Sequence, residues 1–195
     1  MARIGFKKGK YNKIDTATSK YEALKENGKV PCLEKVIDEK FAPEYNSAEL
    51  YADDVLAETD YTFKKGSLTI TVANDDDEKD AFLMGNTIEE GEVVRTVDDT
   101  APEVGYGHIV KKQVGGVKKF KVEFFPRVKF TKITTDAKTR GESVEFGTTS
   151  IEAVVYPLDA DFNGMKSGTW EMHKTFDTET EAEAYLDACL TPSAS

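Results

Sequence analysis

The sequence predicts an α+β protein that is mainly β: an antiparallel β-sandwich or partial barrel with a short helix near residues 76–85 and a C-terminal helix near 178–190. Apolar and polar residues alternate over several segments, as they do in strands with one buried and one solvated face. Only the two named segments carry helix signals. No repeat, low-complexity stretch or linker divides the 195 residues, so we expect a single domain over residues 1–195.

Residues 117–130 give the clearest strand signal. The even positions carry the apolar residues Phe120, Val122, Phe124, Val128 and Phe130. The odd positions carry the charged residues Lys119, Lys121, Glu123, Arg127 and Lys129. This alternation predicts one core face and one charged face. Pro126 lies on the even face and cannot donate a ladder hydrogen bond, so it predicts an edge strand or a bulge.

Other segments have weaker strand signals. We expect strands over residues 5–16, 36–41, 92–97, 104–112, 148–156 and 168–176, the last with Trp170 inside it. Pro43 should end the strand at 36–41. Residues 61–72 are predicted to form a hairpin whose turn is residues 64–67, with Gly66 in the turn. Residues 98–102 and 159–164 are predicted breaks, residues 131–146 a loop or irregular arm, and residues 191–195 a frayed tail.

Both helices are predicted from their ends. Residues 74–78 supply a capping residue and several carboxylates, which a helix N-terminus favours, and Gly85 is a stop signal. In the second helix, Thr178 and Glu181 fit a capping box. Its apolar residues recur at helical spacing on one side: Ala182, Tyr185, Leu186, Cys189 and Leu190.

The net charge of −10 is distributed in blocks of alternating sign. Residues 1–20 carry +5, 34–61 carry −7, 75–104 carry −9, 111–140 carry +8 and 141–195 carry −9. The blocks can neutralise one another inside one folded copy. They can also lie on different surfaces and steer copies of the protein together in a fixed orientation. The two interpretations are compatible.

The sequence carries no complete motif for catalysis, cofactor binding or metal binding. His108 and His173 stand apart from each other and from Cys32 and Cys189, so the spacing of a zinc site is missing. Residues 159–164 match the first half of a calcium loop, but Trp170 occupies the position of the bidentate glutamate. We therefore expect no enzyme activity, no cofactor and no metal, and we expect both histidines to be structural or surface residues and both cysteines to be reduced.

The sequence also bears on location and on partners. The chain has no apolar run long enough to span a membrane and no signal-peptide core, which predicts synthesis in a cytoplasm. The basic face from Lys118 to Lys132 includes Phe125, a combination found on nucleic-acid-binding surfaces. The alternative function is therefore a monomeric β-domain that binds nucleic acid or carbohydrate through this face.

Residues 47–85 resemble the major tail proteins of long, non-contractile-tailed bacteriophages (siphophages). In that family an arm similar to residues 50–54, Leu-Tyr-Ala-Asp-Asp, precedes a strand pair and a small helix that ends in glycine, here residues 76–85. Further similar segments follow in the expected order over nearly the whole chain. They are Ile4–Gly5 with Lys7 and Lys8, residues 98–107, residues 124–126, residues 148–157, and Asn163–Gly164 before Trp170.

The resemblance implies a tail tube protein of the virion, with the phage tail-tube fold and made in the host cytoplasm. Six copies would form a ring whose sheets join around a channel, and rings would stack into the tail. The partners implied are further copies of the chain, the tape measure protein, the tail terminator, and the distal tail or baseplate proteins. Phage DNA would pass through the channel without specific binding, which surplus carboxylates favour because they repel phosphates.

The family's long loop between strands reaches neighbouring subunits, and it maps onto residues 33–59. We hypothesise that this arm bridges rings, with Asp53 and Asp54 meeting the basic block 111–140 of another copy. The residues expected at contacts between subunits are Leu50, Tyr51, Asp53, Asp54, Lys119, Lys121, Arg127 and Lys129. Ring closure requires a heterologous interface, and pairing of sheet edges would remove the hazard of an open edge.

Overall fold

The computed structural model describes residues 2–24, 28–33, 35–52, 55–73, 76–135 and 147–193. These form a mainly β structure with two helices, which confirms the predicted fold class. The strands are β1 Ala2–Asp15, β2 Lys20–Tyr21, β3 Cys32–Leu33, β4 Val36–Ala52, β5 Val55–Val72, β6 Thr87–Glu89, β7 Glu92–Val94, β8 Glu103–Val114, β9 Val117–Thr135, β10 Thr149–Val155 and β11 Met172–Phe176. The helices are α1 Asp77–Met84 and α2 Glu179–Leu190.

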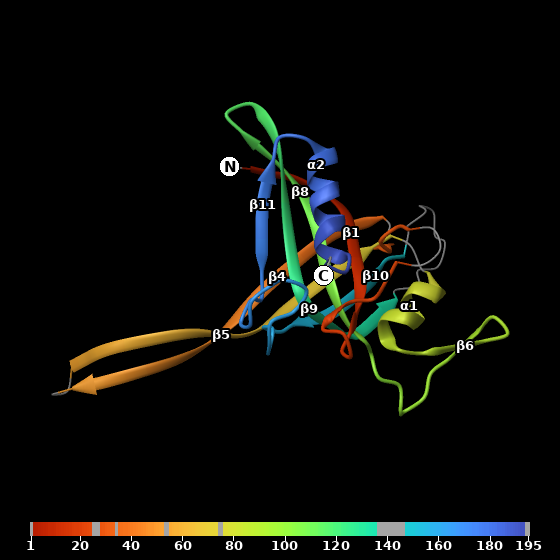
Figure 1. Cartoon of the computed structure of the whole chain (residues 1–195), viewed down its shortest axis with the longest axis horizontal. Helices are drawn as coiled ribbons and strands as arrows, with labels where there is room; N and C mark the ends of the chain where they lie inside the picture. The colour runs from red at the N-terminus through yellow and green to blue at the C-terminus, as the bar shows by residue number, and fades with distance from the viewer. Residues whose placement is uncertain are drawn as a thin grey trace, which may run out of the picture.

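One large antiparallel sheet dominates the molecule (Figure 1). Its strand order is β2-β1-β8-β9-β10-β5-β4, with β3 added to β1 and β11 added to β9. β6 and β7 form a separate two-stranded sheet. Over the described residues the large sheet is open rather than a closed barrel, because β4 pairs with β5 alone. β4 is therefore an edge strand.

A bulge at Pro126 divides β9 into two halves. Val104 pairs with Val128, but Tyr106 pairs with Phe125, so β9 has one residue more than β8 between these pairs. An extra residue moves the following side chains to the opposite face of the sheet. Val122 and Phe124 accordingly lie in the cluster beneath α2, whereas Val128 and Phe130 lie in the cluster on the other face. Of the two alternatives predicted from Pro126, the bulge is confirmed. The prediction of one core face and one charged face is wrong, because the bulge places the apolar residues of the two halves on opposite faces.

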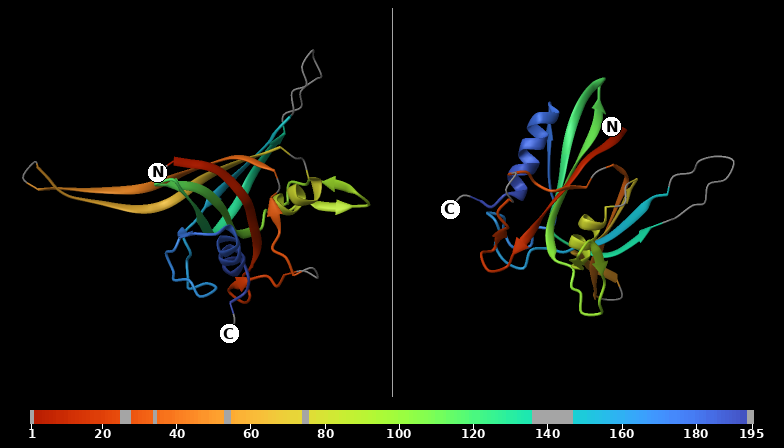
Figure 2. Two further views of the ribbon diagram at one scale, coloured as in Figure 1. Left: turned by 90° about the horizontal axis from the view of Figure 1, so that it is seen from above. Right: turned by 90° about the vertical axis from the view of Figure 1, so that its right-hand side faces the viewer.

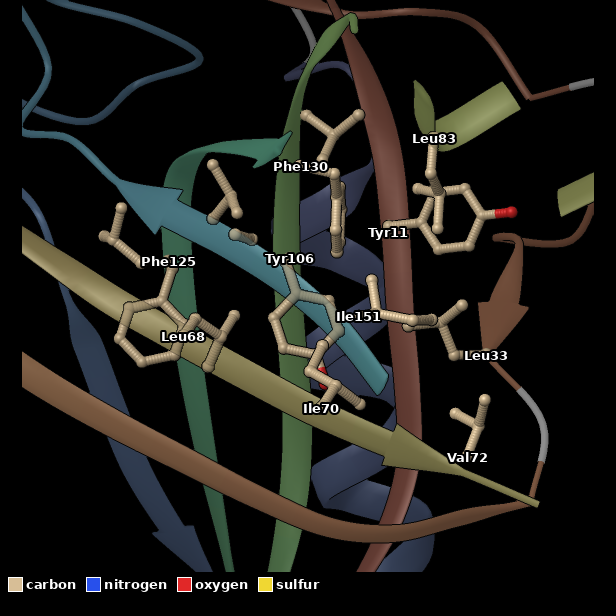
Figure 3. Packing of buried hydrophobic residues seen from close by; sticks show 14 residues of the cluster. Tyr11, Leu33, Leu68, Ile70, Val72, Leu83, Tyr106, Phe125, Phe130 and Ile151 are labelled. Carbon is tan, nitrogen blue, oxygen red and sulfur yellow. The ribbon is translucent and has the colours of Figure 1, made fainter. Parts of the chain in front are cut away.

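The sheet carries a hydrophobic cluster on each face. One cluster joins β5, β8, β9 and β10, and Figure 3 shows Leu68, Ile70, Tyr106 and Ile151 converging in it. The other lies between the sheet and α2, where Leu186 and Leu190 are fully buried. α2 is also held to β1 by charge, since the buried Lys10 Nζ lies 3.1 Å from Glu183 Oε1 and 2.5 Å from Asp187 Oδ1.

Both helix predictions are confirmed by their caps. Asp76 caps α1 by accepting a hydrogen bond from the Lys79 N–H, and Gly85 ends the helix in the left-handed conformation with φ of 72°. A Cβ on Gly85 would overlap the carbonyl of Thr100, so this position has room for glycine alone. Thr178 caps α2 by accepting a hydrogen bond from the Glu181 N–H at 3.3 Å.

The prediction of a hairpin within residues 61–72 is wrong. These residues belong to one uninterrupted strand, β5, which pairs with β4 along its whole length. Gly66 is buried inside the strand, and a Cβ there would overlap the ring of Phe41. Glycine at this position therefore allows an aromatic ring to lie directly on the backbone. A close approach and a turn both use glycine, and the local sequence does not distinguish them.

The prediction that Pro43 ends a strand is also wrong, since β4 continues through Pro43 to Ala52. Pro43 pairs with Gly66 on the edge strand, where a missing N–H on the outer side removes no ladder hydrogen bond. The segment mapped as a long loop is thus largely strand. Three other bounds differ as well: β7 ends at Val94, β9 extends to Thr135, and β11 begins at Met172, after Trp170.

The end of the chain is held in place as far as it is described. The Ser193 N–H donates to Asn163 Oδ1 at 2.7 Å, and the Ser193 carbonyl accepts from Lys20 Nζ at 2.9 Å. The prediction of a frayed tail is therefore wrong for residues 191–193, while residues 194 and 195 lie outside the described residues. Residues 136–146 of the predicted loop also lie outside them.

Candidate functional site

Strands β4 and β5 extend well beyond the body of the protein as a two-stranded ribbon (Figures 1 and 2). From here on, the arm means residues 44–52 and 55–65, which include the outer part of the arm predicted at 33–59, and residues 36–43 with 66–72 are its base. Nine residues of strand at roughly 3.3 Å each give the arm a length of about 30 Å. Side chains at positions 44, 46, 47, 60 and 62 are exposed. Residues 41–63 contain six acidic residues and no Lys or Arg.

Aromatic rings stack where the arm leaves the body. Trp170 lies flat on Phe63, with centroids 4.1 Å apart and planes 9° apart, and Phe41 stacks against the same indole at 5.9 Å. Phe41 in turn contacts the buried Phe125 at 4.8 Å. Tyr45 meets Phe63 edge-on at 6.0 Å. A row of rings therefore runs from the core out to the arm.

This row continues onto the exposed surface. The register shift between Glu44 and Tyr45 places Tyr45 opposite Phe63 and Ser47 opposite Tyr61. Tyr45 is 51% exposed and Tyr61 is 65% exposed. Tyrosine is enriched at protein–protein contacts because it supplies a large apolar area together with a polar hydroxyl. The arm thus presents two exposed tyrosines, and it is acidic apart from Lys64 and Lys65 next to its base.

The residues predicted at contacts between subunits divide into two groups. Leu50 and Tyr51 lie in the outer part of β4, where the backbone alone is described, and Asp53 and Asp54 lie outside the described residues. The basic residues Lys119, Lys121, Arg127 and Lys129 all lie on β9. Within one copy, β4 pairs with β5 alone, so the backbone of Leu50 and Tyr51 makes no strand pairing with β9.

Three of these four basic residues have partners inside the same copy. Lys119 pairs with Asp177, and Lys121 Nζ lies 2.5 Å from Glu123 Oε1. Arg127 makes a two-pronged contact with Glu103, at 2.9 Å for each prong, and also pairs with Asp159. Among the described residues Lys129 shows no ion pair. Neutralisation of charge blocks inside one copy therefore accounts for much of the basic face.

A buried charge cluster lies at the base of the arm, and sequence reasoning missed it. His108 on β8 sits between two carboxylates: its Nε2 is 3.1 Å from Glu123 Oε2, and its Nδ1 is 3.0 Å from Glu39 Oε1. The His108 Nδ1 atom makes no hydrogen bond of normal geometry, so its contact with Glu39 is a close approach of the two side chains. All three side chains are less than 10% exposed. We call this set the Glu39–His108–Glu123 cluster.

Neighbouring strands complete the cluster. The Tyr106 hydroxyl on β8 donates to Glu39 Oε2 at 2.7 Å, and Phe6 on β1 stacks on the His108 ring at 4.8 Å. Glu39 belongs to the edge strand β4, which is separated from β8 in the sheet by three other strands. The cluster therefore fastens the base of the arm across the face of the curved sheet, through contacts that are 67 and 69 residues apart in sequence.

Burial and charge shift the pKa values in this cluster. Burial alone would raise the pKa of the Glu123 carboxyl, but hydrogen bonds from His108 and Lys121 outweigh it and hold that pKa well below its usual range. Burial, followed by the neighbouring Glu39 carboxylate, raises the pKa of the Tyr106 hydroxyl. Glu123 is thus held as a carboxylate, which the low polarity of the site makes costly unless its partners remain in place.

The cluster forms one wall of an open pocket of about 540 Å³, whose lining also includes Ile37, Glu171 and His173. His173 is exposed and lies 3.3 Å from Glu171. Among the described residues, no group of three His, Cys, Asp or Glu side chains is placed to hold a metal ion. Both cysteines are free thiols. Glu39, His108 and Glu123 thus present one imidazole and two carboxylates to the pocket.

No local signal in the sequence could have identified this cluster. Glu39 and His108 each look like an ordinary polar residue within a strand, and their meeting depends on the curvature of the sheet.

Over the described residues, no helix is both long and apolar enough to cross a membrane. Comparison of the sequence with protein-family models and with curated proteins gave no match.

Proposed function

We propose that this protein is a structural subunit that assembles with copies of itself into stacked hexameric rings, forming the tail tube of a siphophage. The observation that carries the proposal is the arm. Its two strands pair with each other, and Figure 1 shows its outer part extending away from the rest of the chain. An isolated two-stranded ribbon is only marginally stable in water, so a partner surface is needed to hold it.

The composition of the arm favours another protein surface as that partner. The exposed Tyr45 and Tyr61 supply apolar contact area, and the absence of Lys and Arg over residues 41–63 demands a partner with positive charge. The basic block 111–140 supplies that charge. Every copy of the chain carries this block as well as the arm, so a second copy can serve as the partner. Lys129 and Lys132 lie near one end of β9, with Lys132 62% exposed despite its 3.5 Å contact with Glu152. They are the residues of the block that we expect Asp53 and Asp54 to meet.

The open sheet edge supports the same proposal. β4 has a strand partner on one side, and an exposed edge of this length attracts another strand. Pro43 blunts this edge in the base, but the strand continues for nine residues beyond it. Rings whose sheets pair edge to edge would cover such an edge, as the resemblance to tail tube proteins implies. In this proposal the ring surrounds the tape measure protein and later conducts DNA.

A monomeric module that binds nucleic acid or carbohydrate through the face from Lys118 to Lys132 is less well supported. Phe125, the aromatic residue of that face, is 2% exposed and packs on Phe41. Glu123 is buried as well, and Lys119, Lys121 and Arg127 are paired with acidic residues. The described residues therefore do not combine free basic charge with exposed rings on this face.

Assembly of the purified protein tests the proposal. We expect the wild-type chain to form rings and tubes at rising concentration, visible by negative-stain electron microscopy and by sedimentation velocity. Asp53→Lys combined with Asp54→Lys should prevent tubes at ordinary salt, because lysines would then face the basic block. The neutral pair Asp53→Asn and Asp54→Asn is the control and should lose less.

Two results would contradict the proposal. A wild-type protein that stays a single copy at millimolar concentration would exclude self-assembly as its function. Normal tubes from the Asp53→Lys and Asp54→Lys variant would exclude the contact between these residues and the basic block, while leaving self-assembly intact.

A further inference from the structure

Exposed apolar side chains gather at three places in the described structure. Ile37, Tyr45 and Tyr61 lie on the strands of the arm and its base. The other four large exposed apolar residues lie in two further segments: Ile88 and Val97 in residues 87–99, and Val114 and Val117, which pair with each other, at the turn between β8 and β9. Single exposed apolar residues are ordinary on a protein surface, whereas contiguous apolar patches rimmed by polar residues mark contact sites.

The first of these segments is what we call the acidic end, residues 87–99. Ile88 is 43% exposed and Val97 is fully exposed. This segment contains five acidic residues and a single basic one, Arg95. Glu89 pairs directly with Glu92 across β6 and β7, with Glu90 in the turn between them. Like charges directly opposite one another destabilise a strand pair, so this ribbon stores repulsion that a positively charged partner would relieve.

The second segment is what we call the basic end, residues 111–121 around the turn between β8 and β9. Val114 and Val117 pair across the turn and are 36% and 57% exposed. The segment contains five lysines and no acidic residue. Lys119 and Lys121 pair with Asp177 and Glu123, whereas Lys118 is exposed beside Val117. The basic end thus has two exposed apolar residues among charged residues of one sign, as the acidic end has, but its charge is positive.

The two ends lie far apart on the molecule. Figure 1 places the turn between β8 and β9 at the top, whereas the hairpin of β6 and β7 projects sideways in the lower half and the connection from β7 to β8 forms the lowest part. Two different surfaces of one chain make a heterologous contact, and such a contact produces an open stack when its rotation does not close a ring. Complementary charge also fixes the orientation in which the copies meet.

We propose that the acidic end of one copy contacts the basic end of a copy in the next ring, so that rings stack head to tail. This inference rests on the proposed function, because it names the surfaces that join one ring to the next. Ile88 and Val97 meet Val114 and Val117 at the centre, and glutamates face lysines around them. The arm joins copies at a different surface, near the other end of β9.

Charge reversal at each end tests the contact. The acidic-end variant carries Glu89→Lys and Glu92→Lys, and the basic-end variant carries Lys112→Glu and Lys118→Glu. Each should form rings but associate into tubes at least about 100-fold more weakly, because like charges then face each other at every subunit of the ring. The chain with all four substitutions has the wild-type net charge, and it should recover tube formation. If the basic-end variant fails to fold, Lys118→Gln replaces it, with a smaller loss expected.

The readouts are ring content by sedimentation velocity and tube length by electron microscopy at about 50 mM and about 500 mM salt, on either side of strong screening. Rings with shortened tubes in both end variants, and recovery in the fourfold variant, support the head-to-tail contact. Tubes of normal length in either end variant at low salt overturn it while leaving the proposed function standing. A wild-type chain that forms neither rings nor tubes overturns the proposed function, and this contact with it.

Discussion

Strands β4 and β5 have a base and an arm that differ in almost everything except their pairing. In the base, Leu68 and Ile70 are buried in the core and Glu39 is held by the charge cluster. In the arm, the same two strands remain paired, yet Tyr45 and Tyr61 are half exposed or more. The base is stabilised inside one copy. The arm has the geometry of a strand pair without the neighbours that normally stabilise one.

The difference teaches that hydrogen-bond pairing and stability are separate properties of a sheet. Backbone pairing contributes little net free energy because water competes for the same groups. Burial of side chains makes the larger contribution. In the arm, past the rings that stack on Trp170, the described side chains at 44–47 and 60–62 are exposed. Substitutions in the base should therefore destabilise a single copy, whereas substitutions in the arm should affect assembly.

The largest expected effect on a single copy comes from His108→Ala. Removing the imidazole leaves the buried Glu39 and Glu123 carboxylates without their shared partner, which we expect to cost about 3–5 kcal/mol of unfolding free energy. Urea denaturation followed by circular dichroism measures it. His173→Ala, at an exposed histidine, is the control and should change stability by less than about 0.5 kcal/mol. Equal effects of the two substitutions would show that the cluster does not fasten the base.

Gly66→Ala should have the next largest effect. The added Cβ would overlap the Phe41 ring, so the ring must move away from Trp170 and Phe125. Overpacking of this kind costs about 1–3 kcal/mol. Gly5→Ala is a matched control, since Gly5 is also in a strand and a Cβ added there would have no atom within 4 Å. Thermal unfolding compares the two, and a Gly66→Ala protein as stable as the control contradicts the close approach.

Low pH should lower the stability of the folded chain by a smaller amount, through the charge cluster at the base of the arm. The folded-state pKa of Glu123 is depressed, so its contribution to stability is fully present above the unfolded pKa of about 4.3 and is lost as the pH falls toward the folded value. We expect the unfolding free energy to decrease below about pH 4, less steeply in Glu123→Gln than in the wild type. Parallel curves for the two proteins between about pH 5 and about pH 2.5 would contradict this assignment.

The smallest effect on a single copy, and the sharpest test of the comparison, comes from Tyr45→Ser with Tyr61→Ser. Both side chains are exposed, so unfolding of the monomer should change by less than about 1 kcal/mol for the pair. Self-association should nevertheless weaken at least about tenfold, because exposed tyrosines at a contact centre carry much of the binding energy. Sedimentation velocity over a concentration series measures it. A loss of monomer stability without a loss of association would contradict the assignment of the arm to association between copies.

Much of the fold follows from local sequence patterns. The alternation of residues 117–130 predicts β9, and Pro126 predicts its bulge, since a residue without an N–H disturbs the ladder wherever it stands inside a sheet. Asp76, Gly85, Thr178 and the apolar stripe of α2 predict both helices. These features depend on residues within one or two turns of each other, where side-chain chemistry and backbone geometry are directly linked.

The candidate site follows from the sequence only in part. The acidic character of the arm is evident from composition, but its strand structure is not, because Pro43 and Gly66 are ordinarily signs of a break. Both are compatible with strand here, Pro43 because β4 is an edge and Gly66 because Phe41 covers it. Whether a residue lies on an edge is a property of the whole sheet, which no local pattern records.

By itself the sequence determined the strand-rich class, the two helices with their caps, and the alternating blocks of charge. Only the tertiary structure decided which charges meet, because pairs such as Glu39 and His108 are brought together by curvature of the sheet over 69 residues of chain. It also decided that the two halves of β9 bury opposite faces, because one bulged residue shifts every later side chain to the other side. Periodicity is a local property, whereas the neighbours that bury or neutralise a side chain are set by the path of the whole chain.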